Sequence, residues 1–141
     1  MKSRIFHTQS EEETIAAGEK LATELPPKAV VLLIGNLGAG KTTLAKGIVT
    51  GLGASQADEV SSPTFTLIHE YSPSVYHVDL YRLDREHQVA TLGLDEIFDR
   101  KAIVLIEWGE RFPTLMPEER IEIRLRVTGE NSREIEVRST M

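Results

Sequence analysis

One stretch of eight residues, GNLGAGKT at positions 35–42, constrains the fold of this chain most strongly. Two of its glycines, followed by Lys41 and Thr42, fit the phosphate-binding pattern G-x-x-x-x-G-K-[ST], the P-loop. Such a loop wraps a polyphosphate in backbone N–H groups, which requires positive φ angles and close approach without a Cβ atom. An apolar run at positions 29–34 precedes it, and apolar residues at helical spacing follow. The stretch therefore predicts a buried strand, a P-loop and a helix that bind a nucleotide.

Each residue type in the loop has its own expected contact with the nucleotide. The following helix points its positive end at the phosphates, Lys41 reaches the β and γ oxygens, and the Thr42 hydroxyl ligates magnesium. The alternative is a glycine-rich turn without a ligand. The predicted nucleotide-binding residues of this segment are Gly35, Asn36, Leu37, Gly38, Ala39, Gly40, Lys41, Thr42 and Thr43.

Length and charge narrow the classes of function. A chain of 141 residues is expected to form one domain, residues 1–141, without room for a separate substrate domain. Its net charge of −6 disfavours autonomous binding to nucleic acid, so any role on RNA would need partner proteins. The sequence has no cysteine, which excludes disulfides and thiolate metal sites. No apolar run is long enough to span a bilayer and no signal core is visible, so we expect a cytoplasmic protein without membrane contact.

A second apolar run, residues 102–106, ends in Glu107 and Trp108. In P-loop proteins a carboxylate at the tip of a buried strand lies beside the phosphate loop, where it holds magnesium or orients the attacking water. Glu107 is therefore a predicted catalytic residue and, with Thr42, a predicted magnesium ligand. The alternative for Glu107 is a solvated strand end. Trp108 either packs under the next helix or is exposed as a partner contact.

Strand alternation over residues 75–82 puts His77 and Asp79 on one face. Burial of both is costly unless each is satisfied, so they either pair with each other and with Arg82 or face a site. His77, like Trp108, is predicted to contact a partner or to serve activity, and whether Asp79, His77 or Glu107 orients the water is left open at this point.

Thr64 follows a proline at the start of another predicted strand, which continues to residue 71. In nucleotide hydrolases the segment after the first helix often brings a hydroxyl to the γ-phosphate and magnesium. The alternative is a threonine that only begins the strand after a turn.

The remaining segments complete an α/β fold. We expect an edge strand at residues 3–7, a helix from a capping box at Ser10 and Glu13 to Pro26, and short helical pieces at 86–90, 94–98 and 111–116. Alternation over 121–127 and 134–138 predicts an antiparallel hairpin that closes one sheet edge, with its arginines paired across the strands to glutamates. The predicted fold is a three-layer P-loop NTPase fold with a central, mostly parallel sheet and antiparallel edge strands.

Five stretches together resemble one family of proteins. They are GNLGAGKTT (35–43), SPTFTL (62–67), YHVDLYRL (76–83), LGLDE (92–96) and LIEW (105–108). The chain resembles TsaE, formerly YjeE, a small bacterial ATPase needed to form threonylcarbamoyladenosine next to the anticodon of tRNAs that read codons starting with A. The resemblance implies Mg²⁺-dependent ATP hydrolysis coupled to a complex of TsaD, which transfers the threonylcarbamoyl group, and TsaB. It implies contact with tRNA only indirectly, through that complex.

The resemblance also implies roles for single residues. It marks Gly38, Gly40 and Lys41 as phosphate ligands, and Thr42 with Glu107 as the magnesium pair.

Four further positions match the family by the same resemblance. Thr64 and Asp79 match nucleotide-sensing or water-orienting groups, and Trp108 matches a residue important for activity. Arg133 matches a basic position suspected of contacting nucleotide.

Two other functions compete with ATP hydrolysis. A small-molecule or nucleotide kinase needs an arginine-rich lid and an acceptor pocket, for which the chain is too short. A GTP-binding switch usually carries Asn-Lys-x-Asp at a strand end, and the sequence has no such motif. Phosphoryl transfer to water also needs positive charge on the developing oxygens, and no arginine follows the loop closely enough to be assigned this role. We therefore expect slow hydrolysis alone and faster hydrolysis in a complex.

Overall fold

A computed structural model describes residues 3–54, 67–72 and 74–140. The elements alternate between strands and helices for most of the chain, as the sequence predicts. In chain order they are β1 (Ser3–Thr8), α1 (Glu11–Ala22), β2 (Ala29–Ile34), α2 (Lys41–Gly51), β3 (Ile68–Ser72), β4 (Val75–Asp79), α3 (Glu86–Ala90), α4 (Leu94–Asp99), β5 (Ile103–Glu107), the 3₁₀ turns η2 (Gly109–Arg111) and η3 (Pro113–Leu115), β6 (Ile121–Val127) and β7 (Arg133–Ser139).

Within the described residues the strands form one seven-stranded sheet in the order β1-β7-β6-β2-β5-β4-β3. The four inner strands β6, β2, β5 and β4 are parallel, and the outer pairs β1–β7, β7–β6 and β4–β3 are antiparallel. This confirms a mostly parallel core with antiparallel edges. The β6–β7 hairpin exists as predicted but does not close the edge. β1 lies outside it, with Ser3 opposite Arg138, because β7 offers its second edge to the start of the chain.

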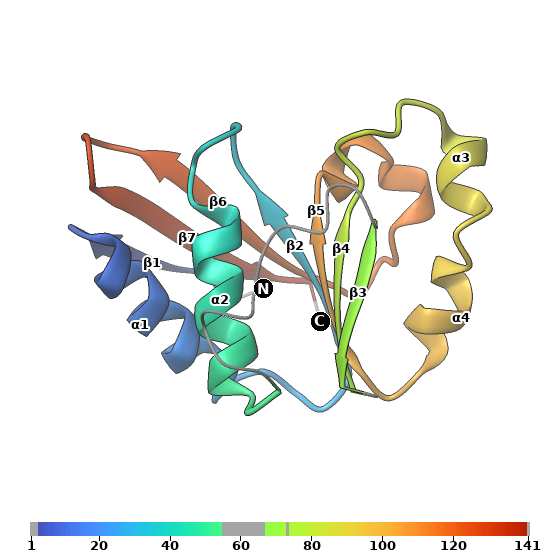
Figure 1. The fold of residues 1–141 in the computed structure, drawn as a ribbon, viewed down its shortest axis with the longest axis horizontal. Helices are drawn as coiled ribbons and strands as arrows, with labels where there is room; N and C mark the ends of the chain where they lie inside the picture. The colour runs from blue at the N-terminus through green and yellow to red at the C-terminus, as the bar shows by residue number, and fades with distance from the viewer. Residues whose placement is uncertain (1–2, 55–66, 73, 141) are drawn as a thin grey trace.

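Helices cover both faces of the sheet and give the predicted three layers (Figure 1). The long helices α1 and α2 pack on one face, against side chains such as Val31 and Leu33 of β2. The short helices α3 and α4 and the two 3₁₀ turns pack on the other face, against the alternate residues Val30 and Leu32. Since β2 is buried on both faces, it reads as the continuous apolar run that the sequence displays.

Helix α1 begins as the sequence predicts and ends earlier. The Ser10 side chain accepts a hydrogen bond from the Glu13 backbone N–H at 3.1 Å, while the Glu13 carboxylate reaches back to the N–H of Gln9 at 2.8 Å. The cap is thus shifted by one residue from an ideal capping box. The helix ends at Ala22, and three residues in turns and a bend separate it from the two prolines at 26 and 27.

Glycines allow α1 and α2 to touch backbone to backbone. A Cβ atom at Gly47 would lie 2.1 Å from the carbonyl oxygen of Ile15, and one at Gly18 would lie 2.6 Å from that of Leu44. Both distances are shorter than atoms allow, so only glycine fits. The first turn of α2, which completes the P-loop, is therefore fixed in place by α1.

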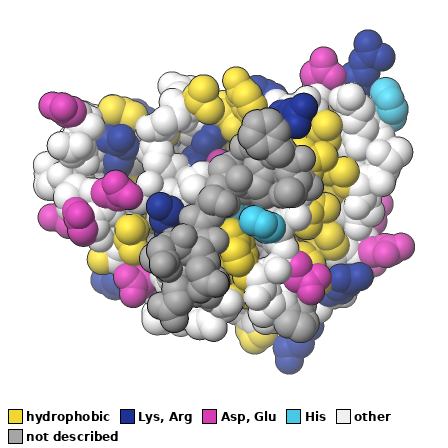
Figure 2. Space-filling view, in the orientation of Figure 1, with side chains coloured by type: hydrophobic (Ala, Val, Ile, Leu, Met, Phe, Trp, Pro, Cys, Tyr) yellow, Lys and Arg dark blue, Asp and Glu magenta, His cyan; other side chains and the backbone are white. Residues whose placement is uncertain are grey.

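Charged side chains on the hairpin pair mostly along a strand rather than across it. Arg126 and Glu134 form a cross-strand ion pair at 3.1 Å, as predicted. Arg120 instead pairs with Glu122 at 2.8 Å, on the same stretch of chain. Residues two apart in a strand share a face, so a flexible arginine reaches its neighbour as easily as its cross-strand partner. Over the face drawn in Figure 2, acidic and basic side chains are interspersed. Among the described residues no helix is long and apolar enough to cross a membrane.

Candidate functional site: a pocket between the P-loop and two strand ends

The P-loop leaves β2 and enters α2 through two residues with left-handed backbone. Gly38 has φ +82° and Gly40 has φ +102°, values that favour glycine. Gly40 caps α2 without any side-chain hydrogen bond, and the first turn of the helix carries no acidic residue. The backbone N–H groups at this end of α2 thus have no competing side chain, and the helix dipole adds positive potential there. This arrangement suits an anion.

Lys41 is buried beneath the loop that it belongs to. Its ammonium donates a hydrogen bond to the carbonyl oxygen of Gly35 at 2.8 Å and lies 3.4 Å from the centre of the Trp108 ring. Burial lowers the pKa of Lys41, while the negative charges of Glu107, Glu110 and Asp79 oppose that shift. A cation held by a carbonyl and an indole ring is available to a stronger ligand such as a phosphate.

The sheet register brings the two predicted carboxylates to one edge. Asp79, at the end of β4, lies opposite Glu107, at the end of β5, and Leu33 of β2 lies opposite Glu107 on the other side. Because parallel strands share an edge at their carboxyl ends, both carboxylates face the P-loop that follows β2. The Thr42 hydroxyl donates to Glu107 Oε2 at 3.2 Å, so the predicted magnesium pair is in contact.

His77 supports Glu107 rather than pairing with Asp79. Its Nε2 lies 2.7 Å from Glu107 Oε2, and its side chain is 0% exposed. With the carboxylate ionised, Nε2 carries the proton of this hydrogen bond. Among the described residues Nδ1 has no hydrogen-bond partner. Complete burial leaves no surface of His77 for a protein partner, whereas a role in activity through Glu107 stays a prediction. Asp79 Oδ1 accepts from the backbone N–H of Tyr81 at 2.9 Å.

A pocket of about 410 Å³ lies between the loop and the strand ends. It brings together most of the predicted site residues and adds Tyr81. Its lining residues are Leu37, Gly38, Gly40, Lys41, Thr42, Thr43, Asp79, Tyr81, Glu107 and Trp108. The predicted residues Gly35, Asn36, Ala39, His77 and Arg133 lie outside this lining. Thr64 falls outside the described residues, so its role stays a prediction.

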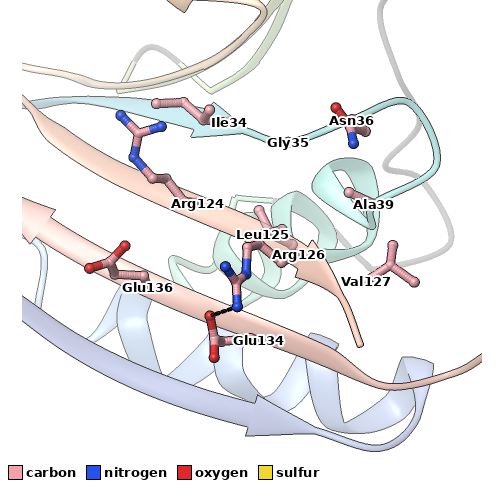
Figure 3. Close-up of a pocket in the computed structure, with 10 residues that line it drawn as sticks. All are labelled: Ile34, Gly35, Asn36, Ala39, Arg124, Leu125, Arg126, Val127, Glu134 and Glu136. Carbon is pink, nitrogen blue, oxygen red and sulfur yellow. Dashed lines mark ion pairs between the residues drawn. The ribbon is translucent and has the colours of Figure 1, made fainter. Parts of the chain in front are cut away.

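A larger hollow of about 600 Å³ lies behind the P-loop, over the hairpin (Figure 3). Asn36 and Ala39 of the loop line it, but its charged side chains come from β6 and β7. Arg126 and Glu134, drawn with a dashed line, neutralise each other there. Lys41 and Glu107 do not line it. The smaller pocket is therefore the candidate site, despite its size.

Arg133 bridges the hairpin turn to the P-loop. Its Nε donates to the carbonyl oxygen of Ala39 at 2.9 Å, and its Nη1 donates to that of Ser132 at 2.8 Å. It also lines a small hollow of about 110 Å³ beside the loop, with Glu11 and Thr14 of α1 among the other lining residues. The sequence pattern did not single out these two α1 residues.

Aromatic side chains form the wall of the pocket opposite the loop. The rings of Tyr81 and Trp108 are tilted against each other with centroids 5.1 Å apart. Trp108 has φ +68°, a left-handed conformation that is unfavourable for a residue of its size. It is the N-cap residue that directly precedes η2. Arg111, at the end of η2, lies over both rings, with its guanidinium carbon 5.1 Å from the Tyr81 centroid and 4.6 Å from that of Trp108. Nothing in the sequence pattern singled out Tyr81 or Arg111.

The donor set at the strand end fits magnesium. A hydroxyl and a carboxylate are hard oxygen ligands, and Mg²⁺ in nucleotide enzymes is held by one or two such groups together with phosphate oxygens. The described residues contain no cluster of three or more His, Cys, Asp or Glu side chains suited to a metal ion. Thr42 and Glu107 would hold the ion.

Comparison with known proteins gives one consistent result. A family model described as "Threonylcarbamoyl adenosine biosynthesis protein TsaE" matches residues 8–135. The chain is 41% identical over 138 residues to the tRNA threonylcarbamoyladenosine biosynthesis protein TsaE of Bacillus subtilis (strain 168), covering 96% of this chain and 85% of that protein. It is 38% identical over 132 residues to the protein of the same name from Treponema pallidum (strain Nichols), covering 92% and 96%. The crystal structure of Bacillus subtilis YdiB superposes with a TM-score of 0.81 at 35% identity, covering 99% of this chain and 87% of that one.

Proposed function

The chain belongs to the TsaE family of threonylcarbamoyl adenosine biosynthesis proteins, and from this premise we propose that it binds and hydrolyses ATP during formation of threonylcarbamoyladenosine in tRNA. The modified position is the one next to the anticodon in tRNAs that read codons starting with A. The reaction assigned to this chain is transfer of the γ-phosphoryl group of ATP to water. Transfer of the threonylcarbamoyl group belongs to a partner.

The contact between Thr42 and Glu107 carries this proposal. Thr42 Oγ1 and Glu107 Oε2 lie 3.2 Å apart in a pocket that also contains Lys41. One group comes from the P-loop helix and the other from a separate strand end. Their meeting supports a hydrolysing site over a glycine-rich turn without a ligand, because a simple turn gives no reason for a buried carboxylate beside it.

Binding of the nucleotide uses the backbone first. The N–H groups around Gly38 and Gly40 and the N-terminus of α2 surround the phosphates, and Lys41 turns from the Gly35 carbonyl to the β and γ oxygens. A magnesium ion bound with the ATP supplies positive charge against the phosphate oxygens. Arg133 supports the loop through its hydrogen bond to the Ala39 carbonyl. It also lines the small hollow next to α1, a position that suits contact with the base or ribose.

The carboxylates of Glu107 and Asp79 have different roles in this proposal. Glu107 is held by His77 and Thr42, which supports a role as the ligand on the magnesium side. Asp79 lines the same pocket without belonging to that pair, so we assign it to orient the attacking water. Trp108 closes the pocket around Lys41 and excludes water from the phosphates.

We further propose that TsaB and TsaD are the partners of this ATPase and that it meets tRNA only through them. The net charge of −6 and the interspersed charges of the face in Figure 2 disfavour direct attraction to a phosphate backbone. Hydrolysis is expected to be slow alone and faster in the assembled complex.

The test is ATP hydrolysis by the purified chain, alone and with TsaB plus TsaD, for the wild type and Glu107→Ala. Glu119→Ala is the matched control, because Glu119 is exposed and lies away from the pocket. Stimulation by the partners that is lost in Glu107→Ala and kept in Glu119→Ala supports the proposal. Equal turnover with and without partners contradicts the partnership, and turnover unaffected by Glu107→Ala contradicts the site.

A further inference from the structure

Arg111 is the cation that the sequence pattern did not supply. It lies at the end of η2, on a solvent-exposed position, and its Nη1 donates to the carbonyl oxygen of Tyr81 at 2.8 Å. Its guanidinium also lies over the rings of Tyr81 and Trp108. Both rings line the pocket that contains Lys41 and Glu107, so the guanidinium contacts the aromatic wall of that pocket.

The charge of Arg111 already acts on the pocket. Trp108 has two cations against its ring, the Lys41 ammonium at 3.4 Å from the centroid and the Arg111 guanidinium carbon at 4.6 Å. Burial lowers the pKa of Lys41, and the positive charge of Arg111 adds to that lowering. The positive charge of Arg111 near Lys41 is electrostatically unfavourable while the pocket holds no anion. Once a phosphate binds, the same charge attracts it.

Within the part of the chain that the structure describes, Arg111 forms no ion pair with a glutamate or aspartate, and the acidic charge that acts on it is that of the adjacent Glu110. Arg120, Arg124 and Arg126, by contrast, are each paired with a glutamate. The contacts that hold Arg111 are one hydrogen bond to a neutral carbonyl and two ring contacts at an exposed position, all of which are weak. An arginine held in this way is free to turn toward a triphosphate.

We propose that Arg111 is the catalytic arginine of ATP hydrolysis, supplied by this chain itself. Its guanidinium leaves the Tyr81 carbonyl and donates hydrogen bonds to the oxygens of the γ-phosphoryl group as that group moves from ADP to water. This role rests on the proposed function and adds a catalytic residue to it. The guanidinium suits it because its planar fork matches phosphate oxygens and stays charged at any physiological pH.

In the step itself, the oxygen of water forms a bond to the γ-phosphorus, and the bond from that phosphorus to the β–γ bridging oxygen breaks. The electron pair of the broken bond stays on the β-phosphate of ADP, and a proton of the attacking water leaves through Asp79 to solvent. Arg111 neither gains nor loses a proton. It stabilises the negative charge that develops on the transferred group and on the leaving oxygen.

The test compares Arg111→Ala, Arg111→Lys and the control Arg138→Ala under the conditions of fastest wild-type turnover, with or without TsaB and TsaD. Arg138 is also an exposed arginine, but it pairs with Glu136 on the distant part of β7. The readouts are kcat, the Kd for ADP, the Kd for ADP with aluminium fluoride, and recovery of Arg111→Ala turnover by guanidinium at low millimolar concentration. A catalytic arginine is worth about 10³-fold or more in turnover.

We expect kcat of Arg111→Ala to fall at least about 10²-fold while its Kd for ADP changes less than about threefold, and we expect guanidinium to restore part of the turnover. Tight binding of ADP with aluminium fluoride should be lost in parallel, and Arg111→Lys should remain slow. Unchanged kcat overturns the proposal. So does a fall without guanidinium recovery and with an equal loss of ADP affinity, which would mark Arg111 as a support for the aromatic rings. If the wild type itself neither binds nor hydrolyses ATP, the proposed function fails first, and this role fails with it.

Discussion

The two walls of the pocket are built in different ways. The loop wall consists of Leu37, Gly38 and residues 40–43, which come from one short stretch of the sequence, and it acts mainly through its backbone. The strand-end wall, Asp79, Tyr81, Glu107 and Trp108, comes from the ends of β4 and β5 and acts through side chains. The loop wall depends on the helices behind it, whereas the strand-end wall depends on sheet register and buried hydrogen bonds. Mutations should therefore affect the two walls through different contacts.

The largest effect is expected behind the loop wall. A methyl group at Gly47 would collide with the Ile15 carbonyl oxygen at 2.1 Å, so Gly47→Ala must push α2 away from α1. We expect the free energy of unfolding to fall by about 3 kcal/mol or more, measured by urea denaturation, even though alanine favours helix. Affinity for ADP should fall as well, because the first turn of α2 moves. Lys46→Ala, one position earlier on α2, serves as control and should change stability by less than about 0.5 kcal/mol.

The strand-end wall should respond to His77. Replacing His77 by Leu removes the hydrogen bond to Glu107 and leaves a buried carboxylate short of a partner. We expect a loss of about 2 kcal/mol in unfolding free energy and weaker binding of ATP in the presence of magnesium, with ADP affinity in the absence of magnesium nearly unchanged.

His77→Gln is the matched variant, because its amide nitrogen can donate from nearly the same position as Nε2. It should recover at least half of the lost stability. Equal losses in the Leu and Gln variants would show that packing, and not the hydrogen bond, holds Glu107.

A smaller effect is expected where the hairpin supports the loop wall. Arg133→Met keeps the length of the side chain and removes its hydrogen bonds to the carbonyls of Ala39 and Ser132. We expect a loss of about 1 kcal/mol in stability and a several-fold weaker Kd for ADP by calorimetry. Arg138→Met should change neither. An unchanged ADP affinity in Arg133→Met would mean that the loop wall needs no support from the hairpin.

The smallest effect concerns Glu110, whose Oε1 is buried without a hydrogen-bond partner among the described residues. Burial raises the pKa of this carboxyl above its usual 4.5. The folded state therefore holds the proton more tightly than the unfolded chain, and stability is lost as pH rises from 4.5 through the raised pKa. Glu110→Gln does not titrate, so its stability relative to wild type should increase with pH, by less than about 1 kcal/mol, in urea unfolding from pH 4.5 to 8. A flat difference over that range would contradict this.

The sequence predicted the loop wall almost completely and the strand-end wall in part. Lys41 and Thr42 belong to a motif whose geometry is local, and Glu107 was predicted because strand tips near a P-loop share an edge. The partner of His77 was not predictable, since it depends on the register between β4 and β5. Arg111 was missed because its approach to the pocket depends on the left-handed backbone at Trp108, which no local pattern requires of a tryptophan.

The pairing of β1 with β7 has a consequence for how the molecule is made. Ser3 lies opposite Arg138, so among the described strands the first in chain order pairs with the last. Helices α1 and α2, which touch through Gly18 and Gly47, can assemble long before that, from contacts close in sequence. Both edges of β1 then stay unpaired until β7 has been synthesised and has formed. Closure of this edge of the sheet is thus a late step of folding, and until it occurs the edges of this short strand are open to wrong pairing.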